Sequence, residues 1–180
     1  MNQMPSRRTF LAAGLAAAGC GPKRGVGFPG FAFVANHDGD ALAAVDLTAF
    51  AVAKHIPVGG RPVAVIAHPA RPSVYVLTPA TGAVHEISSA RLAFVRKLAL
   101  RGQPVSMRLA GDGRALWIAC RQPNLLVRVP LHTFRVEAQI PLGAEPFELD
   151  LCQKEPRAAV SFGRHCALAI IDLEIGRAHV

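Results

Sequence analysis

The sequence lacks several features that would place it in a familiar class of protein. It contains no apolar run long enough to cross a bilayer as a helix, which excludes a protein that crosses the membrane several times. Charged residues make up only 18% of the chain and hydrophobic residues 51%, which excludes a long disordered chain. The 180 residues are therefore enough for one domain with a real core.

Concentrated positive charge is also absent. The formal net charge is +8, from 20 Lys and Arg against 12 Asp and Glu. Five of the basic residues lie in segments that we read below as terminal additions: Arg7, Arg8, Lys23, Arg24 and Arg177. Without them, 15 basic residues face 12 acidic ones, a balance of +3. Because no run of five like charges and no basic helix occurs, we predict no nucleic-acid partner.

Motifs that carry catalytic or metal chemistry are missing too. Neither Gly-x-Ser-x-Gly, His-Glu-x-x-His, Cys-x-x-Cys-His nor a phosphate-binding glycine loop is present. The histidines outside the terminal segments fall at different phases of the repeat described below: His37, His55, His68, His85, His132 and His165. A metal on a symmetry axis would need equivalent positions. We therefore predict no catalytic residue, no metal and no cofactor.

The N-terminus has the pattern of an export signal, predicted over residues 1–19. Arg7 and Arg8 precede Thr-Phe-Leu and a short Ala/Gly/Leu segment, which resembles a twin-arginine signal. Ala17-Ala18-Gly19-Cys20 resembles a bacterial lipobox, in which Cys20 becomes lipidated, although Ala17 stands where Leu is usual. The alternative is cleavage near Ala18, which gives a soluble periplasmic protein. Residues 20–30 read as a flexible tether.

An ungapped repeat of 42 residues organises the rest of the chain. Pro62, Pro104 and Pro146 are each 42 residues apart. In the same register, aromatic residues recur at Phe33, Tyr75 and Trp117. Further apolar columns are Val34, Val76, Ile118 and Val160, and Val45, Ile87, Val129 and Ile171. So many apolar columns in register indicate a repeat architecture.

Each period contains four short apolar runs separated by Pro, Gly, Asn and Asp. In the second period they span residues 62–68, 74–78, 83–88 and 92–100. Several alternate apolar and polar residues, and no sustained 3.6-residue period follows the signal, so the runs predict strands. Four strands per 40–45 residues are typical of a β-propeller blade. The fold class predicted is all-β, with four-stranded antiparallel blades over residues 31–174.

The repeat resembles the YVTN-type β-propeller family. The segments that carry the resemblance are Phe33–Asn36, Tyr75–Thr78, Ala43–Leu47, Lys54–Gly59 and Pro62–Val65. The resemblance implies an exported protein, often seven-bladed, with strand A innermost and strand D outermost in each blade. It implies little about function.

The predicted blades do not close a ring. Residues 62–103 and 104–145 make two complete blades, residues 31–58 lack strand A, and residues 146–173 lack strand D. About 3.5 blades are therefore present. Residues 175–180 break the pattern and match one reading frame of a common sequencing-library adapter, so we expect them to be a non-native tail. The chain would then be a truncated form of a protein with about seven blades. The alternative is a genuine short protein that closes by dimerising, since open sheet edges are a liability.

The cysteines match no zinc or heme spacing. With Cys20 assigned to the lipid, three cysteines remain: Cys120, Cys152 and Cys166. Because three is an odd number, they cannot all form disulfides with one another. We expect small buried residues rather than a site.

Loops that join strands D to A and B to C surround one mouth of a propeller channel. The resemblance makes them the expected ligand rim, with these charged residues: His37, Asp38, Arg61, Arg101, Arg121, Arg164 and His165. Arginines from neighbouring blades could gather a small anionic ligand or an acidic protein loop. The expected inner-strand residues are Arg108, Glu148 and Asp150, and Arg108 and Asp150 occupy equivalent positions that favour an ion pair. The simpler interpretation is that the loop residues are solvated turns and that Arg108 and Asp150 form a structural ion pair.

The function expected from these patterns is non-catalytic binding. The chain would be an exported binding scaffold, lipid-anchored in the periplasm, that presents loops to a protein or a small anionic ligand. The alternative is a propeller enzyme or redox-enzyme accessory, either lactonase-like or quinone/copper-linked. A third possibility is a short module that forms a ring by self-association.

Overall fold

The computed structural model describes residues 28–152, 154–163, 167–174 and 177–179. For residues 177–179 it describes the backbone only. The predicted signal peptide, with Arg7, Arg8 and Cys20, lies outside the described residues, as do Arg164, His165 and Cys166. The described residues form strands, turns and one 3-10 turn, η1 (Pro79–Thr81). No described segment forms a helix long and apolar enough to cross a membrane.

The strands form four antiparallel sheets that follow one another along the chain. The first sheet contains β1 (Phe31–Asn36), β2 (Ala41–Asp46) and β3 (Ala51–Pro57). The second contains β4 (Ala64–Ala67), β5 (Ser73–Thr78), β6 (Ala83–Ser88) and β7 (Ala93–Ala99). The third contains β8 (Gln103–Leu109), β9 (Ala115–Arg121), β10 (Leu125–Pro130) and β11 (Ala138–Pro141). The fourth contains β12 (Pro146–Leu151), β13 (Arg157–Phe162), β14 (Ala167–Asp172) and β15 (Arg177–His179).

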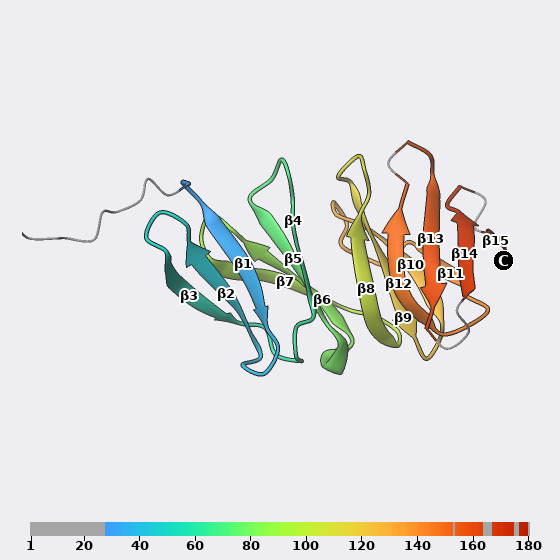
Figure 1. Cartoon of the computed structure of the whole chain (residues 1–180), viewed down its shortest axis with the longest axis horizontal. Coiled ribbons are helices and arrows are strands. Elements are labelled where there is room, and N and C mark those ends of the chain that lie inside the picture. The colour runs from blue at the N-terminus through green and yellow to red at the C-terminus, as the bar shows by residue number, and fades with distance from the viewer. Residues whose placement is uncertain (1–27, 153, 164–166, 175–176, 180) are drawn as a thin grey trace, which may run out of the picture.

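Each sheet pairs its strands in chain order, as expected for propeller blades. The sheets stand side by side in an open arc (Figure 1). The first strands β4, β8 and β12 contact one another from sheet to sheet, which makes them the inner edge of the arc. The predicted all-β fold of four-stranded blades is confirmed, and the described residues do not close a ring.

The fourth sheet corrects one expectation. We expected the last blade to lack its outer strand, but β15 pairs with β14 in antiparallel register, Ile171 opposite Ala178. The expectation was wrong because it required an apolar strand, whereas sheet pairing is made by backbone N–H and C=O groups of any sequence. The first sheet has the three strands that were expected.

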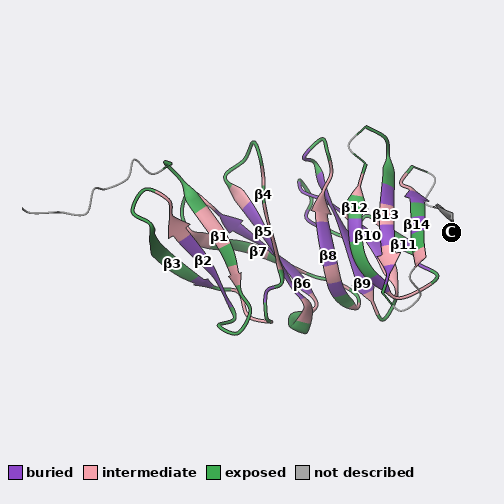
Figure 2. Ribbon diagram, viewed as in Figure 1, coloured by how far each residue is buried: buried purple, intermediate pink, exposed green. Residues whose placement is uncertain are grey.

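Packing between successive sheets forms the core. One apolar cluster joins the first and second sheets and includes Leu42 and Val76. A second, around Tyr75 and Ile118, joins the second and third sheets. A third, around Trp117 and Val160, joins the third and fourth. Figure 2 shows buried residues concentrated on the middle strands of the sheets, whereas the loops and outer strands such as β3 are largely exposed. The apolar columns of the repeat are therefore the contacts between blades.

Candidate functional site

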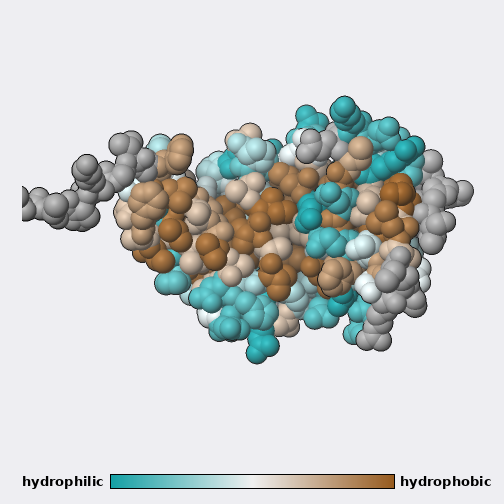
Figure 3. All heavy atoms as spheres, in the orientation of Figure 1, coloured by the Kyte–Doolittle hydropathy of each residue, from teal (hydrophilic) through white to brown (hydrophobic). Residues whose placement is uncertain are grey.

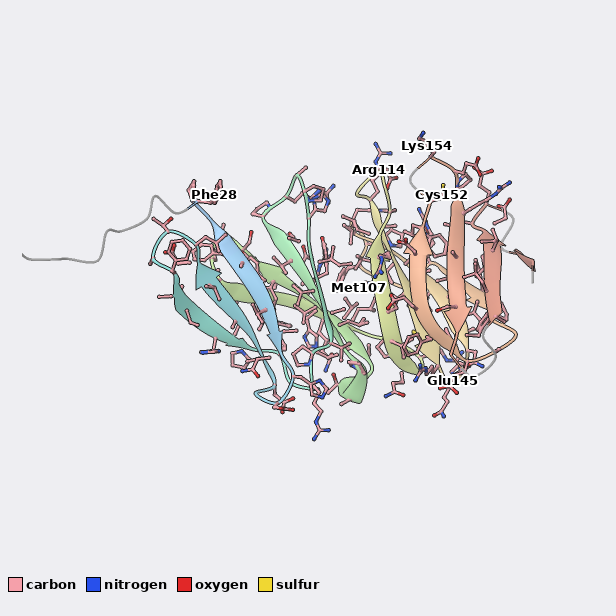
Figure 4. All side chains as sticks on the ribbon, in the orientation of Figure 1. Phe28, Met107, Arg114, Glu145, Cys152 and Lys154 are labelled. Carbon is pink, nitrogen blue, oxygen red and sulfur yellow. The ribbon has the colours of Figure 1, made fainter. Side chains whose placement is uncertain are left out.

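The predicted ligand rim forms one edge of the arc. His37 and Asp38 lie between β1 and β2, Arg61 precedes β4, Arg101 precedes β8, and Arg121 ends β9. Figure 4 marks this lower edge by Glu145, which precedes β12 on the same side. The first four of these side chains are exposed. The described part of the predicted rim thus lies on one side of the fold.

Arg121 is not an open ligand group on this rim. Its Nε lies 3.2 Å from Oε1 of Glu145 and donates a hydrogen bond of 2.8 Å to the carbonyl of Pro146. These contacts join the third sheet to the start of the fourth. Among the rim arginines that the structure describes, only Arg61 and Arg101 remain without an ion pair. The predicted arginine cluster is therefore weaker than the sequence suggested.

The three predicted channel residues form one polar cluster on β8 and β12. Arg108 Nη2 lies 3.1 Å from Glu148 Oε1, and Arg108 Nε lies 3.4 Å from Asp150 Oδ1. The ion pair expected between equivalent positions is thus present. Ser106, which is buried, donates a 2.5 Å hydrogen bond to Glu148 Oε1 and accepts the backbone N–H of Leu149 at 3.3 Å.

This cluster links two blades rather than opening a site. Both carboxylates share the one cation, Arg108, and Glu148 also accepts from the Ser106 hydroxyl, so the side chains are bonded to one another across the two blades. The ion pairs are partly exposed and contribute about 0–1 kcal/mol each. We therefore assign Arg108, Glu148 and Asp150 a structural role at the inner edge.

A cleft at the opposite edge has the geometry of a ligand site. It lies between the third and fourth sheets and has a volume of about 490 Å³. Figure 4 places Cys152 and Lys154 at this upper edge, away from Glu145. The lining comes from the β8–β9 turn, the β12–β13 loop and the start of the β14–β15 connection, with Trp117 and Arg128 between them. Small-molecule sites are typically about 300–1,000 Å³.

The aromatic wall of the cleft is the indole of Trp117. Trp117 belongs to the aromatic column of the repeat, and its neighbours pack it into the cluster between the third and fourth sheets. It is nearly buried but still lines the cleft. No hydrogen bond to its indole N–H is found among the described residues, so the group can donate to a ligand placed against it.

The charges of the cleft are partly committed and partly open. Arg128 pairs with Glu137, and Glu155 pairs with Arg157 at 2.9 Å. Asp112 Oδ1 accepts the backbone N–H of Arg114 at 2.8 Å and stabilises the turn.

Lys154 and Glu174 line the same cleft, and neither has an ion pair within the described chain. The cleft thus offers one cation without an ion pair, Lys154, and two carboxylates without one, Glu174 and Asp112, beside an indole. Figure 3 shows the wider setting: hydrophilic side chains along the loop edges and apolar side chains across the middle of this face.

The two described cysteines differ sharply. Cys120 is buried in the cluster between the second and third sheets, and burial raises the pKa of its thiol to about 12. Cys152 is exposed and lines both the cleft and a neighbouring cavity of about 410 Å³. The expectation of buried cysteines therefore holds for Cys120 and is wrong for Cys152, because Cys152 follows the last residue of β12 and leaves the sheet.

Sequence reasoning missed this cleft. Gly111, Asp112 and Gly113 form the turn between β8 and β9. The cleft arises because that turn lies beside the β12–β13 loop, about 40 residues later in the chain. The available signals were the 42-residue spacing of Asp112 and Lys154, which places their turns in adjacent blades, and the charged character of Lys154 and Glu155. Among the described residues, no group of three His, Cys, Asp or Glu side chains is placed to hold a metal.

No protein-family model matches the chain, and no match was found among curated proteins. Solved structures do resemble it. The hydrazine synthase of Kuenenia stuttgartiensis superposes with a TM-score of 0.77 at 16% identity, over 84% of this chain and 45% of that one. The dihydro-heme d1 dehydrogenase NirN, solved in complex with DHE, superposes with a TM-score of 0.65 at 15% identity, over 83% of this chain and 37% of that one.

The chain therefore spans less than half the length of either solved structure. At such low identity the likeness is one of fold, and membership of the YVTN-type family stays a prediction. What the geometry and the solved structures establish together is that this chain is a run of β-propeller blades.

Proposed function

We propose that the chain is a binding segment of an exported β-propeller, and that it holds a small ligand in the cleft between its third and fourth sheets. The observation that carries the proposal is the cleft itself, a 490 Å³ space with an aromatic wall and open charges of both signs.

The ligand class follows from the lining. Trp117 offers an apolar surface and an unpaired N–H, while Lys154 and Glu174 offer opposite charges. The ligand that best matches this set is a small zwitterion with an apolar body. The simple anion expected at the other rim is supported less well, because Arg121 is already paired with Glu145.

The cellular setting that we propose is the periplasm. Arg7 and Arg8 in the export pattern and Cys20 in the lipobox-like segment support an exported protein held at a membrane by a lipid. A membrane-anchored propeller would present its loop edges to solutes outside the cytoplasm. The anchor is tested separately, by the mass of the mature N-terminal peptide: a lipidated Cys20 supports it, and an unmodified N-terminus after Ala18 contradicts it.

Trp117 makes the cleft proposal directly testable, because it is the only tryptophan in the chain. Its fluorescence reports on the cleft without a label. Three probes share one aromatic ring and differ in charge: phenylalanine is zwitterionic, 3-phenylpropionate is anionic, and phenethylamine is cationic. We expect a saturable change in Trp117 emission with phenylalanine at a concentration at least about tenfold below that needed for the other two.

Variants identify the source of the signal. Lys154→Ala and Glu174→Ala should each raise the phenylalanine dissociation constant about tenfold, as expected for the loss of one charge-assisted contact. Arg114→Ala is the matched control, because Arg114 lies on the same edge and does not line the cleft. A signal that fails to saturate with every probe, or that is lost equally in the control, would contradict the proposal.

The second candidate is a propeller enzyme or redox-enzyme accessory. Its support is the names of the two solved propellers, one a hydrazine synthase and the other a dihydro-heme d1 dehydrogenase. Adding heme to the purified chain and recording the visible spectrum tests it. A saturable shift of the heme absorbance, at one heme per chain, would favour the redox role over zwitterion binding, and an unchanged spectrum would count against heme chemistry in this chain.

A further inference from the structure

A second cavity lies between the first and second sheets. Its volume is about 380 Å³, and its walls come from the start of β1, the β4–β5 turn and the residues that follow β6. In Figure 1 the β4–β5 turn lies at the same upper edge as the β8–β9 turn, which lines the cleft. Both walls of this cavity belong to neighbouring sheets of the described chain. We call it the first-junction cavity.

The first-junction cavity is the repeat equivalent of the cleft. Seven of its lining residues lie 84 residues, two periods of 42, before residues that line the cleft. Phe33 thus corresponds to Trp117, and Arg71 corresponds to Glu155. The two spaces therefore occupy the same place between neighbouring blades, although the charges that line them differ.

The same place between the second and third sheets is filled by side chains. There the guanidinium of Arg96 pairs with Glu86 and lies over the ring of Phe134. One period earlier, Ala44 stands in the position of Glu86 and Leu92 in the position of Phe134. Because these smaller side chains fill less volume, the place between the first and second sheets is left open.

Hydrogen bonds hold the β4–β5 turn that borders the cavity. His68 Nδ1 accepts the backbone N–H two residues later at 3.0 Å, so its Nε2 donates to the carbonyl of Gly113 at 2.9 Å. The backbone N–H of Ser89 donates to the carbonyl of Pro72 at 2.9 Å. Both ring nitrogens of His68 are committed, which leaves Arg71 as the cation of the cavity. A turn that is already fixed loses little conformational freedom when a ligand binds.

The lining of the cavity combines one open cation with an apolar wall. Arg71 is exposed and makes no ion pair within the described chain. No Asp or Glu is found among the described residues that line the cavity, whereas the hydroxyl of Ser89 lines it. The rings of Phe31 and Phe33, with centres 6.4 Å apart, supply the apolar wall.

We propose that the first-junction cavity binds a small monocarboxylate with an apolar body, such as an aryl carboxylate. Arg71 pairs with the carboxylate, since a guanidinium presents two parallel N–H donors to such a group. The apolar body lies against Phe31 and Phe33. A zwitterion fits less well, because no acidic side chain of the described lining matches its ammonium group. This site is separate from the cleft between the third and fourth sheets and does not depend on the ligand of that cleft.

An indole moved to this cavity tests the proposal. In the double variant Phe33→Trp/Trp117→Phe, the only tryptophan lines the first-junction cavity, and the repeat already carries both residue types in this column. We expect 3-phenylpropionate to change the emission saturably, at a concentration at least about tenfold below that needed for phenylalanine or phenethylamine. The cleft is expected to favour phenylalanine instead, so the two sites can fail independently. Far-ultraviolet circular dichroism checks that the double variant is folded.

Substitutions of the cation identify the group that binds the carboxylate. Arg71→Ala in the same background should raise the dissociation constant of 3-phenylpropionate at least about tenfold. Arg71→Lys should recover part of that loss, because it keeps the charge without the two parallel donors. Arg91→Ala is the matched control, since Arg91 is an exposed arginine that follows β6 and does not line the cavity. A response that never saturates, that favours phenylalanine or phenethylamine, or that weakens equally in Arg71→Ala and Arg91→Ala would overturn the proposal.

Equilibrium dialysis of the protein with its natural tryptophan covers the case in which the double variant does not fold. One molecule of 3-phenylpropionate should bind per chain, and this binding should be lost in Arg71→Ala and kept in Arg91→Ala. Undetectable binding to the natural sequence, or binding that Arg71→Ala leaves unchanged, would contradict a carboxylate site at the first junction.

Discussion

The guanidinium of Arg96 lies 4.3 Å from the centre of the Phe134 ring. Arg96 is on β7, the outer strand of the second sheet, and Phe134 is in the connection that follows β10 of the third. The same guanidinium donates to the carbonyl of Leu131 at 2.7 Å and to Glu86 Oε2 at 2.5 Å. Phe134 in turn packs on Tyr75 with ring centres 6.3 Å apart. One side chain thus fastens two blades at their outer side.

Removing the cation at this junction should destabilise the fold. Arg96→Met leaves the nearly buried carboxylate of Glu86 without a cation, so we expect the free energy of unfolding to fall by about 2–3 kcal/mol. The double variant Arg96→Met/Glu86→Leu should recover most of that loss, because no buried charge remains unpaired. Urea unfolding measures both.

Arg91→Met controls for the loss of a positive charge in the same sheet, because Arg91 is exposed and has no ion pair among the described residues. If the double variant were as unstable as the single one, the pairing of Arg96 with Glu86 would not be the cause.

His85 should make stability depend on pH. It is buried on β6, and burial followed by the nearby charge of Lys97 lowers its pKa from 6.5 to about 4. Its Nε2 lies 3.0 Å from Thr78 Oγ1, while its Nδ1 has no partner. At pH 7.5 and above the ring is almost entirely neutral in both states. As the pH falls toward 4, the unfolded chain binds a proton that the folded chain does not, so stability falls.

We expect His85 to reduce the free energy of unfolding by about 2 kcal/mol between pH 7.5 and pH 5.0. His85→Val removes the titrating group and restores the residue that the next repeat carries at this position, Val127. The difference between the two pH values should shrink by that amount in the variant, measured by urea unfolding at each pH. An equal pH dependence in both proteins would show that other groups cause it.

Gly102 and Gly59 should differ in their tolerance of alanine. Both have positive φ, +87° and +67°, so both substitutions strain the backbone. A Cβ on Gly102 would lie 2.3 Å from the carbonyl oxygen of Arg121, whereas nothing lies within 4 Å of a Cβ on Gly59. We expect Gly59→Ala to cost about 1 kcal/mol and Gly102→Ala at least about 2 kcal/mol more, because the backbone must move. Thermal unfolding compares the two, and equal losses would refute the close contact.

The two described cysteines should react at very different rates. Cys152 is exposed, whereas the thiol of Cys120 is buried and has a pKa of about 12, so it holds almost no thiolate at neutral pH. With a disulfide reagent such as DTNB at pH 8, Cys152→Ser should remove one rapidly reacting thiol per chain. Cys120→Ser should lower the number of thiols that react with DTNB only after the protein is denatured. A rapid thiol lost in Cys120→Ser would contradict the burial of Cys120.

The repeat made much of the fold predictable. The apolar runs of the second period correspond to β4, β5, β6 and β7 within one or two residues at most ends. The pairing of Arg108 with Asp150 was predictable from register alone, because equivalent positions of adjacent blades face each other. The strand β15 was not predictable, since its pairing depends on backbone groups and carries no apolar pattern.

The candidate cleft was only partly predictable in the same way. Asp112 and Lys154 are 42 residues apart and therefore occupy equivalent turns of adjacent blades, but no motif marks the space between those turns. Likewise, the sequence predicts Arg121 as a free cation on the rim, whereas in the structure its Nε lies 3.2 Å from Oε1 of Glu145. Whether a charge is open or paired depends on a partner that the spacing does not name.

The all-β architecture, the period of 42 residues and the residues that face neighbouring blades could be read from the amino-acid pattern, because burial of apolar side chains follows a fixed alternation along each strand. Which charges are already paired, and that Val34 and Leu168 are exposed, became known from the three-dimensional arrangement of the sheets. Those properties arise from contacts between segments far apart in the chain, and such contacts depend on how the sheets are placed in space.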